Sequence, residues 1–159
     1  MIFKKDFFLL FASDFTFRYG YQIGKMPLLP YFAMILGASE ILVGTILSIS
    51  TLTGMFLKPI IGFLSDQLGR KVWLLIASIF FIFFPFMYQF VDTPTELTIL
   101  RIFHGVATAI LGPVTLALVA DMSESNSSIK MGVFGMARSA AYLFAPITAG
   151  LILNYFSIE

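Results

Sequence analysis

Long apolar stretches alternate with short polar segments along the whole chain, and this pattern predicts five helices that cross a lipid bilayer. The hydrocarbon core of a bilayer is about 30 Å thick, and a helix spans it with about 20 residues. Stretches of this kind cover residues 7–32, 41–65, 72–91, 97–120 and 131–156. The third contains no charged residue, whereas the first is the least apolar and is assigned partly from its context.

Prolines lie inside these stretches, at Pro27, Pro59, Pro85, Pro113 and Pro146. In water they would argue against helices, but in a membrane bundle neighbouring helices and local adjustments satisfy the freed backbone groups. The connectors are short, so consecutive helices are expected to be antiparallel neighbours. The predicted fold class is therefore all-α, a polytopic transmembrane bundle that forms one domain over residues 1–159.

Composition supports a membrane protein and excludes several other classes. Hydrophobic residues make up 58% of the chain and charged residues 12%, whereas a soluble domain carries about 25% charged residues. The net charge of +1 gives no reason to expect a nucleic acid as partner. The chain has no cysteine, and it has no nucleotide-binding loop, metal-ligand cluster or nucleophile–base set. We therefore expect neither a cofactor, a metal nor catalysis.

The basic residues predict the orientation. They gather before the first stretch and in the second and fourth connectors. The first and third connectors contain acidic residues but no Lys or Arg. Cytoplasmic loops carry an excess of Lys and Arg, so we expect a cytoplasmic N-terminus in a multi-pass protein of the plasma (inner) membrane. The basic residues are Lys4, Lys5, Arg70, Lys71 and Lys130, and the acidic ones are Glu40, Asp92 and Glu96.

The connector after the second stretch has a specific spacing, Gly62-x-x-x-Asp66-x-x-Gly69-Arg70-Lys71. Gly62 is expected to let another helix approach closely, and Gly69 to allow a tight reversal with a positive φ. Asp66 lies near the negative end of a helix dipole. We therefore expect it to pair with a cation or with the N-terminus of another helix.

This spacing closely resembles the cytoplasmic loop signature of the major facilitator superfamily. Two further elements agree with the same family in order, Arg101-Ile102-Phe103-His104-Gly105 and Ala120-Asp121. The resemblance covers essentially the whole chain. It implies that Asp66, Arg70 and Asp121 latch the outward-facing arrangement, although Gln67 stands where the family usually has a base. The alternative is that Arg70 and Lys71 only enforce topology.

Ionisable residues inside the stretches are costly in a bilayer and are read as functional by default. Asp14, Arg18, Tyr21 and Lys25 fall within about 60° of one helix face, and Asp14 and Arg18 are spaced to form an ion pair. A second stripe is formed by Arg101, His104, Thr108 and Thr115, and the fifth stretch adds Arg138. We expect these faces to converge on a polar pathway for a substrate and protons.

Several of these residues have alternative explanations. Arg18, Lys25 and Lys58 could extend their charged ends to the membrane interface, and His104 could be a hydrogen-bonded packing residue. The suspected pathway also contains more base than acid, since Asp14 is its one acidic residue. Either acids come from a part of the protein outside this chain, or the substrate is anionic.

The fifth stretch resembles an exporter pattern of the same superfamily. Exporters often carry a glycine-rich sequence here that ends Gly-Pro-x-x-Gly-Gly, and the matching segment is Ala145-Pro146-Ile147-Thr148-Ala149-Gly150. Gly132 is in register and Ala141 replaces a glycine. Small residues four positions apart, which any packed membrane helix can also show, allow helices to approach closely. The ridge comprises Ala137, Ala141, Ala145 and Ala149.

The resemblance implies the first five spans of a six-helix N-terminal half, and transporters of this kind rock two halves about a central site. We expect a fragment that works with the remaining helices of a parent transporter. The expected activity is secondary active transport of a small solute by alternating access, as proton-coupled export. The alternatives are a proton-coupled importer of an organic anion, and a non-transporting membrane receptor or assembly protein.

Overall fold

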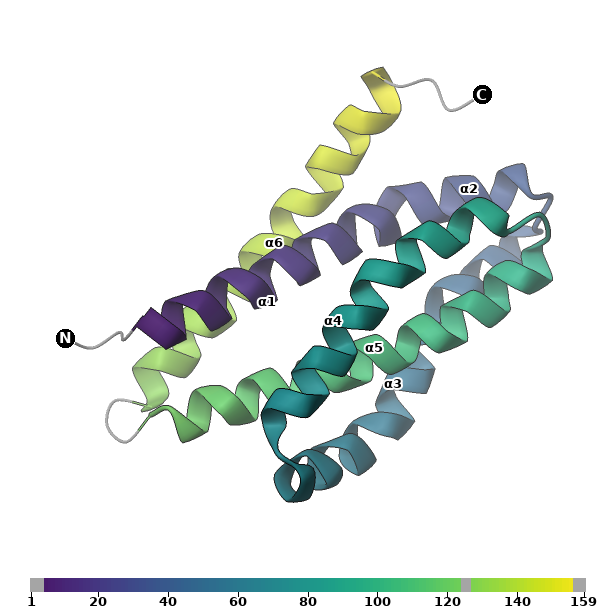
Figure 1. Cartoon of the computed structure of the whole chain (residues 1–159). Coiled ribbons are helices and arrows are strands. Elements are labelled where there is room, and N and C mark those ends of the chain that lie inside the picture. Colours follow the sequence, from purple (N-terminus) through teal and green to yellow (C-terminus); the bar gives the residue numbers. More distant parts are fainter. Residues whose placement is uncertain (1–4, 124–126, 156–159) are drawn as a thin grey trace. The chain divides into compact units, whose positions relative to one another are not determined.

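The computed structural model describes residues 5–123 and 127–155, and every regular element in these ranges is a helix (Figure 1). The predicted all-α fold class is confirmed. The helices are α1 (Lys5–Ile23), η1 (Gly24–Leu28), α2 (Leu29–Ile35), α3 (Glu40–Leu68), α4 (Arg70–Met87), η2 (Tyr88–Phe90), α5 (Pro94–Asp121) and α6 (Ser127–Tyr155). They form two compact units, of which one comprises Met1–Leu29 with Leu116–Glu159 and the other Pro30–Thr115.

Within the described residues, four helices are long and apolar enough to cross a membrane: α3, α4 with η2, α5 and α6. They correspond to the second to fifth predicted spans. The first predicted span, 7–32, is wrong as a continuous helix, because η1 interrupts it. Met26 has extended angles of φ −149° and ψ 118°, since the ring of a following proline, here Pro27, disfavours helical geometry. Lys4 and the end of the fifth span at position 156 lie outside the described residues.

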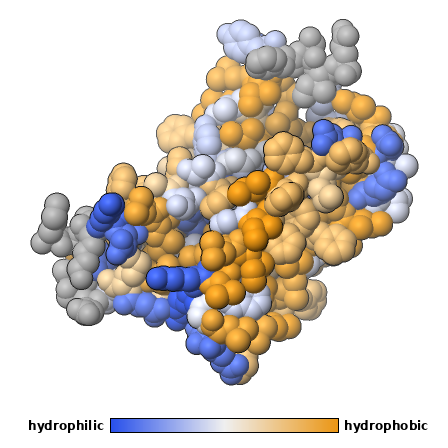
Figure 2. Space-filling view, viewed as in Figure 1, coloured by the Kyte–Doolittle hydropathy of each residue, from blue (hydrophilic) through white to orange (hydrophobic). Residues whose placement is uncertain are grey.

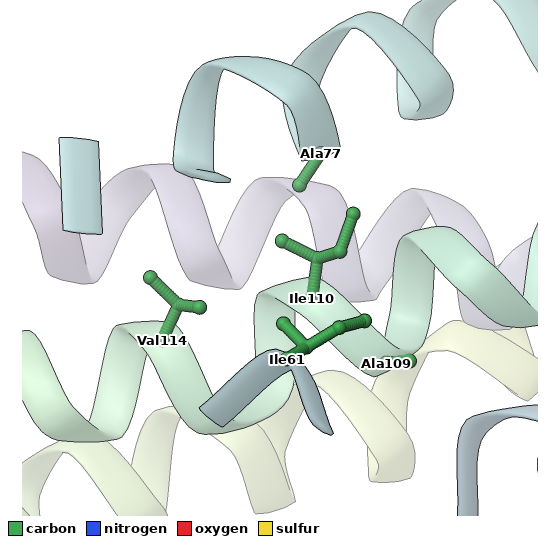
Figure 3. Packing of buried hydrophobic residues seen from close by; sticks show 5 residues of the cluster. All are labelled: Ile61, Ala77, Ala109, Ile110 and Val114. Atoms are coloured by element: carbon green, nitrogen blue, oxygen red, sulfur yellow. The ribbon is translucent and has the colours of Figure 1, made fainter. Parts of the chain in front are cut away.

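The core of the Pro30–Thr115 unit forms where α3, α4 and α5 meet. Figure 3 shows its five central residues: Ile61 from α3, Ala77 from α4, and Ala109, Ile110 and Val114 from α5. At least 95% of the surface of each is buried. The alanines keep the helices close, while the branched side chains fill the space between them.

Two glycines mark the closest approach between α3 and α5. A Cβ atom added to Gly105 would lie 2.7 Å from both the carbonyl oxygen of Ser50 and the Cβ of Thr53, and one added to Gly54 would lie 3.4 Å from Thr108 Oγ1. The glycine at this contact, Gly105, follows Arg101 by four positions. A Cβ at Gly62 would meet no atom within 4 Å among the described residues, so the close approach expected there stays a prediction.

In the other unit, α1 packs against α6. Phe7, Val119 and Phe134 form a buried cluster, and the rings of Phe7 and Phe11 each lie 6.5 Å from that of Phe134. These aromatic contacts join α1 to the first half of α6. They set the register in which the polar residues of the two helices meet.

Large apolar side chains remain exposed on the spanning helices, and Figure 2 shows them over much of the visible surface. Phe56 and Phe63 on α3 and Leu75 and Phe83 on α4 are each at least 63% exposed. A soluble protein rarely leaves so much apolar surface in water. In a bilayer these side chains contact lipid or further helices.

Replacing Gly105 by alanine tests the contact between α3 and α5. The new methyl group would overlap the α3 backbone, so we expect unfolding in detergent to become easier by about 1–3 kcal/mol. Gly44→Ala is the matched control, since a Cβ at Gly44 meets nothing within 4 Å. It should be neutral or stabilising by up to about 1 kcal/mol. Circular dichroism at 222 nm during heating measures both, and equal effects would contradict this account of the packing.

Candidate functional site

An ion cluster lies between α1 and α6. Asp14 is 2% exposed, and its Oδ2 accepts hydrogen bonds from Arg18 Nε at 2.7 Å and from Arg138 Nε at 3.3 Å. Arg18 follows Asp14 by one helical turn, and Arg138 comes from the facing helix. We call these three residues the Asp14 cluster. The predicted Asp14–Arg18 pair is present, and Arg138 joins it.

The Asp14 cluster is not balanced in charge or in hydrogen bonds. Two guanidinium groups share one carboxylate oxygen, which leaves one net positive charge. The Oδ1 atom of Asp14 and the Nη2 atom of Arg18 are both buried, and neither has a hydrogen-bond partner among the described residues. Arg138 also lies over the ring of Phe134, with 4.9 Å between its Cζ and the ring centroid. This aromatic contact stabilises a cation without neutralising it.

Four alanines continue the buried face of α6 beside Phe134 and Arg138. Ala137, Ala141, Ala145 and Ala149 are all at most 7% exposed, so the predicted alanine ridge is buried. Further along the same two helices, the hydroxyl groups of Tyr19 and Thr148 form a hydrogen bond.

The other predicted packing positions of α6 have no packing partner among the described residues. Gly132, Pro146 and Gly150 are exposed, and a Cβ added to either glycine would meet no atom within 4 Å. The packing assigned to these three residues stays a prediction. The remaining polar residues of the first stretch lie nearer η1, where Lys25 Nζ is 5.8 Å from the ring centroid of Tyr21.

A second polar site lies in the Pro30–Thr115 unit and is built around Arg101, which is 1% exposed. Its Nη2 donates to Ser50 Oγ at 2.5 Å, and its Nε donates to the carbonyl oxygen of Ile46 at 3.5 Å. Its Nη1 lies 3.4 Å from the hydroxyl oxygen of Tyr88. That hydroxyl is also 3.1 Å from Nδ1 of His104. Tyr88 thus links the arginine to the histidine.

His104 is a packed residue as well as a polar one. It is 6% exposed, and its ring centroid lies 5.9 Å from that of Phe81 and 5.4 Å from that of Phe84. Thr108 and Thr115, on the same predicted stripe, donate to carbonyl oxygens of their own helix at 2.9 and 2.6 Å. Their hydroxyl hydrogens are therefore used within α5.

Sequence reasoning missed Ser50 and Tyr88. Ser50 belongs to a row on α3, with Ile46 and Gly54 one turn away on either side, and that row is buried against α5. A serine in the row of α3 that packs against the arginine-bearing helix could therefore have been predicted as a hydrogen-bond partner of Arg101. Tyr88 follows the predicted membrane-spanning helix at the point where α4 changes to η2.

The polar connector between α3 and α4 is one residue long. Gly69 has φ +91°, as expected for the reversal. Arg70 Nη1 lies 2.7 Å from Asp66 Oδ1, so the expected pairing of Asp66 with a cation is present. Asp66 is 62% exposed, and such surface pairs contribute at most about 1 kcal/mol. The pair therefore orients these groups more than it stabilises the fold.

Other predicted positions lie at the ends of helices or on exposed faces. Lys71 and Lys58 are exposed, and Asp121 ends α5 in the unit that contains α6. The exposure of Lys58 agrees with the interface alternative. Within the described residues no group of three or more histidine or acidic side chains could hold a metal ion.

The predicted pathway residues thus fall into two sets. Asp14, Arg18 and Arg138 meet in one compact unit, and Arg101 and His104 lie within 3.4 Å of a shared tyrosine hydroxyl in the other. Their convergence on one pathway stays a prediction, as does the proximity of Arg70 to Asp121.

Ser50→Ala tests the site around Arg101. The substitution removes an acceptor from a buried guanidinium group, so we expect a loss of about 1–3 kcal/mol in the free energy of unfolding. Ser48→Ala is the matched control, because Ser48 is exposed and donates only to the Gly44 carbonyl of its own helix among the contacts described. It should change stability by at most about 0.5 kcal/mol. Thermal unfolding in detergent compares them, and a harmless Ser50→Ala would show that the contact is dispensable.

Comparison with known proteins agrees with these features. The family model described as "Major Facilitator Superfamily" matches residues 7–159. The chain is 27% identical over 158 residues to an uncharacterized MFS-type transporter, MJ1560, of Methanocaldococcus jannaschii, covering 98% of this chain and 40% of that protein. It is 28% identical over 151 residues to the quinolone resistance protein NorA of Staphylococcus aureus, covering 95% and 37%. The chain thus spans about two fifths of these relatives. It is an integral, multi-pass membrane protein that belongs to the major facilitator superfamily.

Proposed function

We propose that the chain takes part in secondary active transport of a small solute, without catalysis, by alternating access. The Asp14 cluster is the observation that carries this proposal. Three charged side chains meet at a largely buried point between two helices. Charge is costly at such a point, so its presence indicates a function. Family membership supports the same activity.

The substrate and proton pathway in this proposal follows the polar faces of the two units. Asp14, Arg18 and Arg138 contact the solute, with Tyr21 and Lys25 further along the first helix. Arg101 and His104, joined through Tyr88, respond to protons. Histidine is the side chain that can bind and release a proton near neutral pH when unperturbed. Protonation at this point would therefore change the contacts of Arg101.

Export is the direction we propose. One relative is named a quinolone resistance protein, and α6 retains a buried small-residue ridge in the place of the exporter pattern. Import of an organic anion is the alternative, and the excess of base over acid in the Asp14 cluster favours it. A receptor or assembly role is the remaining alternative, and it predicts that the cluster can be neutralised without functional loss.

The orientation and the latch complete the proposal. The protein lies in the plasma (inner) membrane with its N-terminus in the cytoplasm. This orientation places the α3–α4 connector on the cytoplasmic side. There Asp66 and Arg70 pair and engage Asp121 in the outward-facing state. We further propose that the chain supplies five spans of an N-terminal half, and that the remaining helices of the transporter complete the pathway.

Transport is tested in inverted bacterial membrane vesicles that contain the chain in its full reading frame. Uptake of a quinolone into these vesicles, measured by its fluorescence, should require a proton gradient and stop when an ionophore collapses it. Arg138→Gln should lower the initial rate by about tenfold or more, because the Asp14 cluster loses its α6 partner. Lys5→Gln is the matched control, since Lys5 is exposed at the start of α1, and it should keep the rate.

Two results would contradict proton-coupled export. Uptake that persists without the gradient would exclude proton coupling. Accumulation of an organic anion in right-side-out vesicles under an inward proton gradient, lost in Arg138→Gln, would establish the importer instead.

The latch is tested separately by Asp66→Asn. The loss of the Arg70 partner should leave substrate binding within about twofold and lower the transport rate by about tenfold. Asp92→Asn, an exposed carboxylate before α5, is the control and should transport normally. If both variants transport at the parental rate, the loop sets topology only.

A further inference from the structure

The Asp14 cluster contains two guanidinium groups and one carboxylate, and both arginines contact the same oxygen of that carboxylate. We propose that the cluster is a binding site for the carboxylate of an organic anion, and that Asp14 holds the site when no ligand is bound. This inference rests on the proposed function, because the site is the same. It adds the chemical class of the solute.

Charge is the first argument. With Asp14 ionised, the three residues carry one net positive charge between them, and Asp14 and Arg138 come from different helices. Charge is costly in a low-dielectric environment. A monoanion would neutralise the cluster, whereas a cation would be repelled by it. The cluster therefore selects for negative charge among solutes that reach it.

Hydrogen bonding is the second argument. A guanidinium group presents five donors in a planar fork that matches a carboxylate. The contacts to Asp14 use Nε of each arginine, and Nη2 of Arg18 is buried without a partner among the described residues. A carboxylate can accept from this nitrogen. Asp14 Oδ1 is similarly buried without a partner, so the carboxylate of Asp14 is itself held through one oxygen.

The surroundings favour a small acid. Phe134 and Ala141, which lie beside Arg138 on α6, are at most 1% exposed and are already packed within the chain, whereas the side chains of Arg18 and Arg138 are 15% and 16% exposed. An anion would therefore reach the arginines from their exposed side, and a small monocarboxylate is the fitting probe.

Binding is measured with the purified full-length protein in detergent, by fluorine NMR of 4-fluorobenzoate. The parent should bind 4-fluorobenzoate at least about tenfold more tightly than the uncharged 4-fluorobenzamide, because only the first has a charge for the arginines. Arg18→Gln should weaken binding of the anion by about tenfold. Lys5→Gln, which removes an exposed positive charge on the same helix, should leave binding unchanged.

Asp14→Asn is the decisive variant. It removes the internal competitor and keeps the shape of the side chain, so it should bind 4-fluorobenzoate about tenfold more tightly than the parent. A purely structural role for Asp14 predicts no gain. If Arg18→Gln does not fold, Arg18→Lys keeps the charge and loses the planar fork, and should still bind the anion more weakly than the parent.

The outcomes separate this inference from the proposed function. Equal binding of the acid and the amide, or no gain in Asp14→Asn, overturns the anion site, and water then completes the hydrogen bonds. Transport of a quinolone together with either result leaves the transport proposal standing. Binding with the expected variant profile, in a protein that transports no solute in either direction, supports the anion site and overturns transport.

Discussion

The carboxylate of Asp14, shared by Arg18 and Arg138, is the interaction on which the polar organisation of α1 and α6 depends. It pairs with Arg18 of its own helix at 2.7 Å and joins α1 to α6 through Arg138 at 3.3 Å. Taking these charges out of water is costly, and their mutual attraction offsets that cost only while the set stays together. The aromatic cluster of Phe7, Phe11 and Phe134 sets the register that allows them to meet.

The second unit solves a similar problem with neutral groups. Arg101 is only 1% exposed, and it contacts a serine hydroxyl, a backbone carbonyl and a tyrosine hydroxyl. The near contact at Gly105 is what brings α3 close enough for Ser50 to reach the arginine, which lies one turn earlier on α5. Packing and polar chemistry are thus coupled, because a larger residue at Gly105 would separate the groups that stabilise the buried charge.

The polar contacts of the chain are of two kinds, local and tertiary. The connector signature is local, since Gly69 supplies the reversal and Asp66 pairs with Arg70 across it. The Asp14 cluster instead requires side chains of two different helices to meet. In the proposed function the cluster acts in solute selection and the connector in the change of state.

The sequence by itself determined the all-α class, the family and four of the five spans, because apolar length and the spacing from Gly62 to Lys71 are local properties. It also determined the Asp14–Arg18 pair, which one helical turn fixes. Only the tertiary structure decided that Arg138 joins that pair, that Ser50 and Tyr88 contact Arg101, and that Gly105 lies at the close contact of α3 with α5. These depend on the rotation and register of one helix against another. Such quantities follow from the fit of whole surfaces, and no short stretch of sequence specifies them.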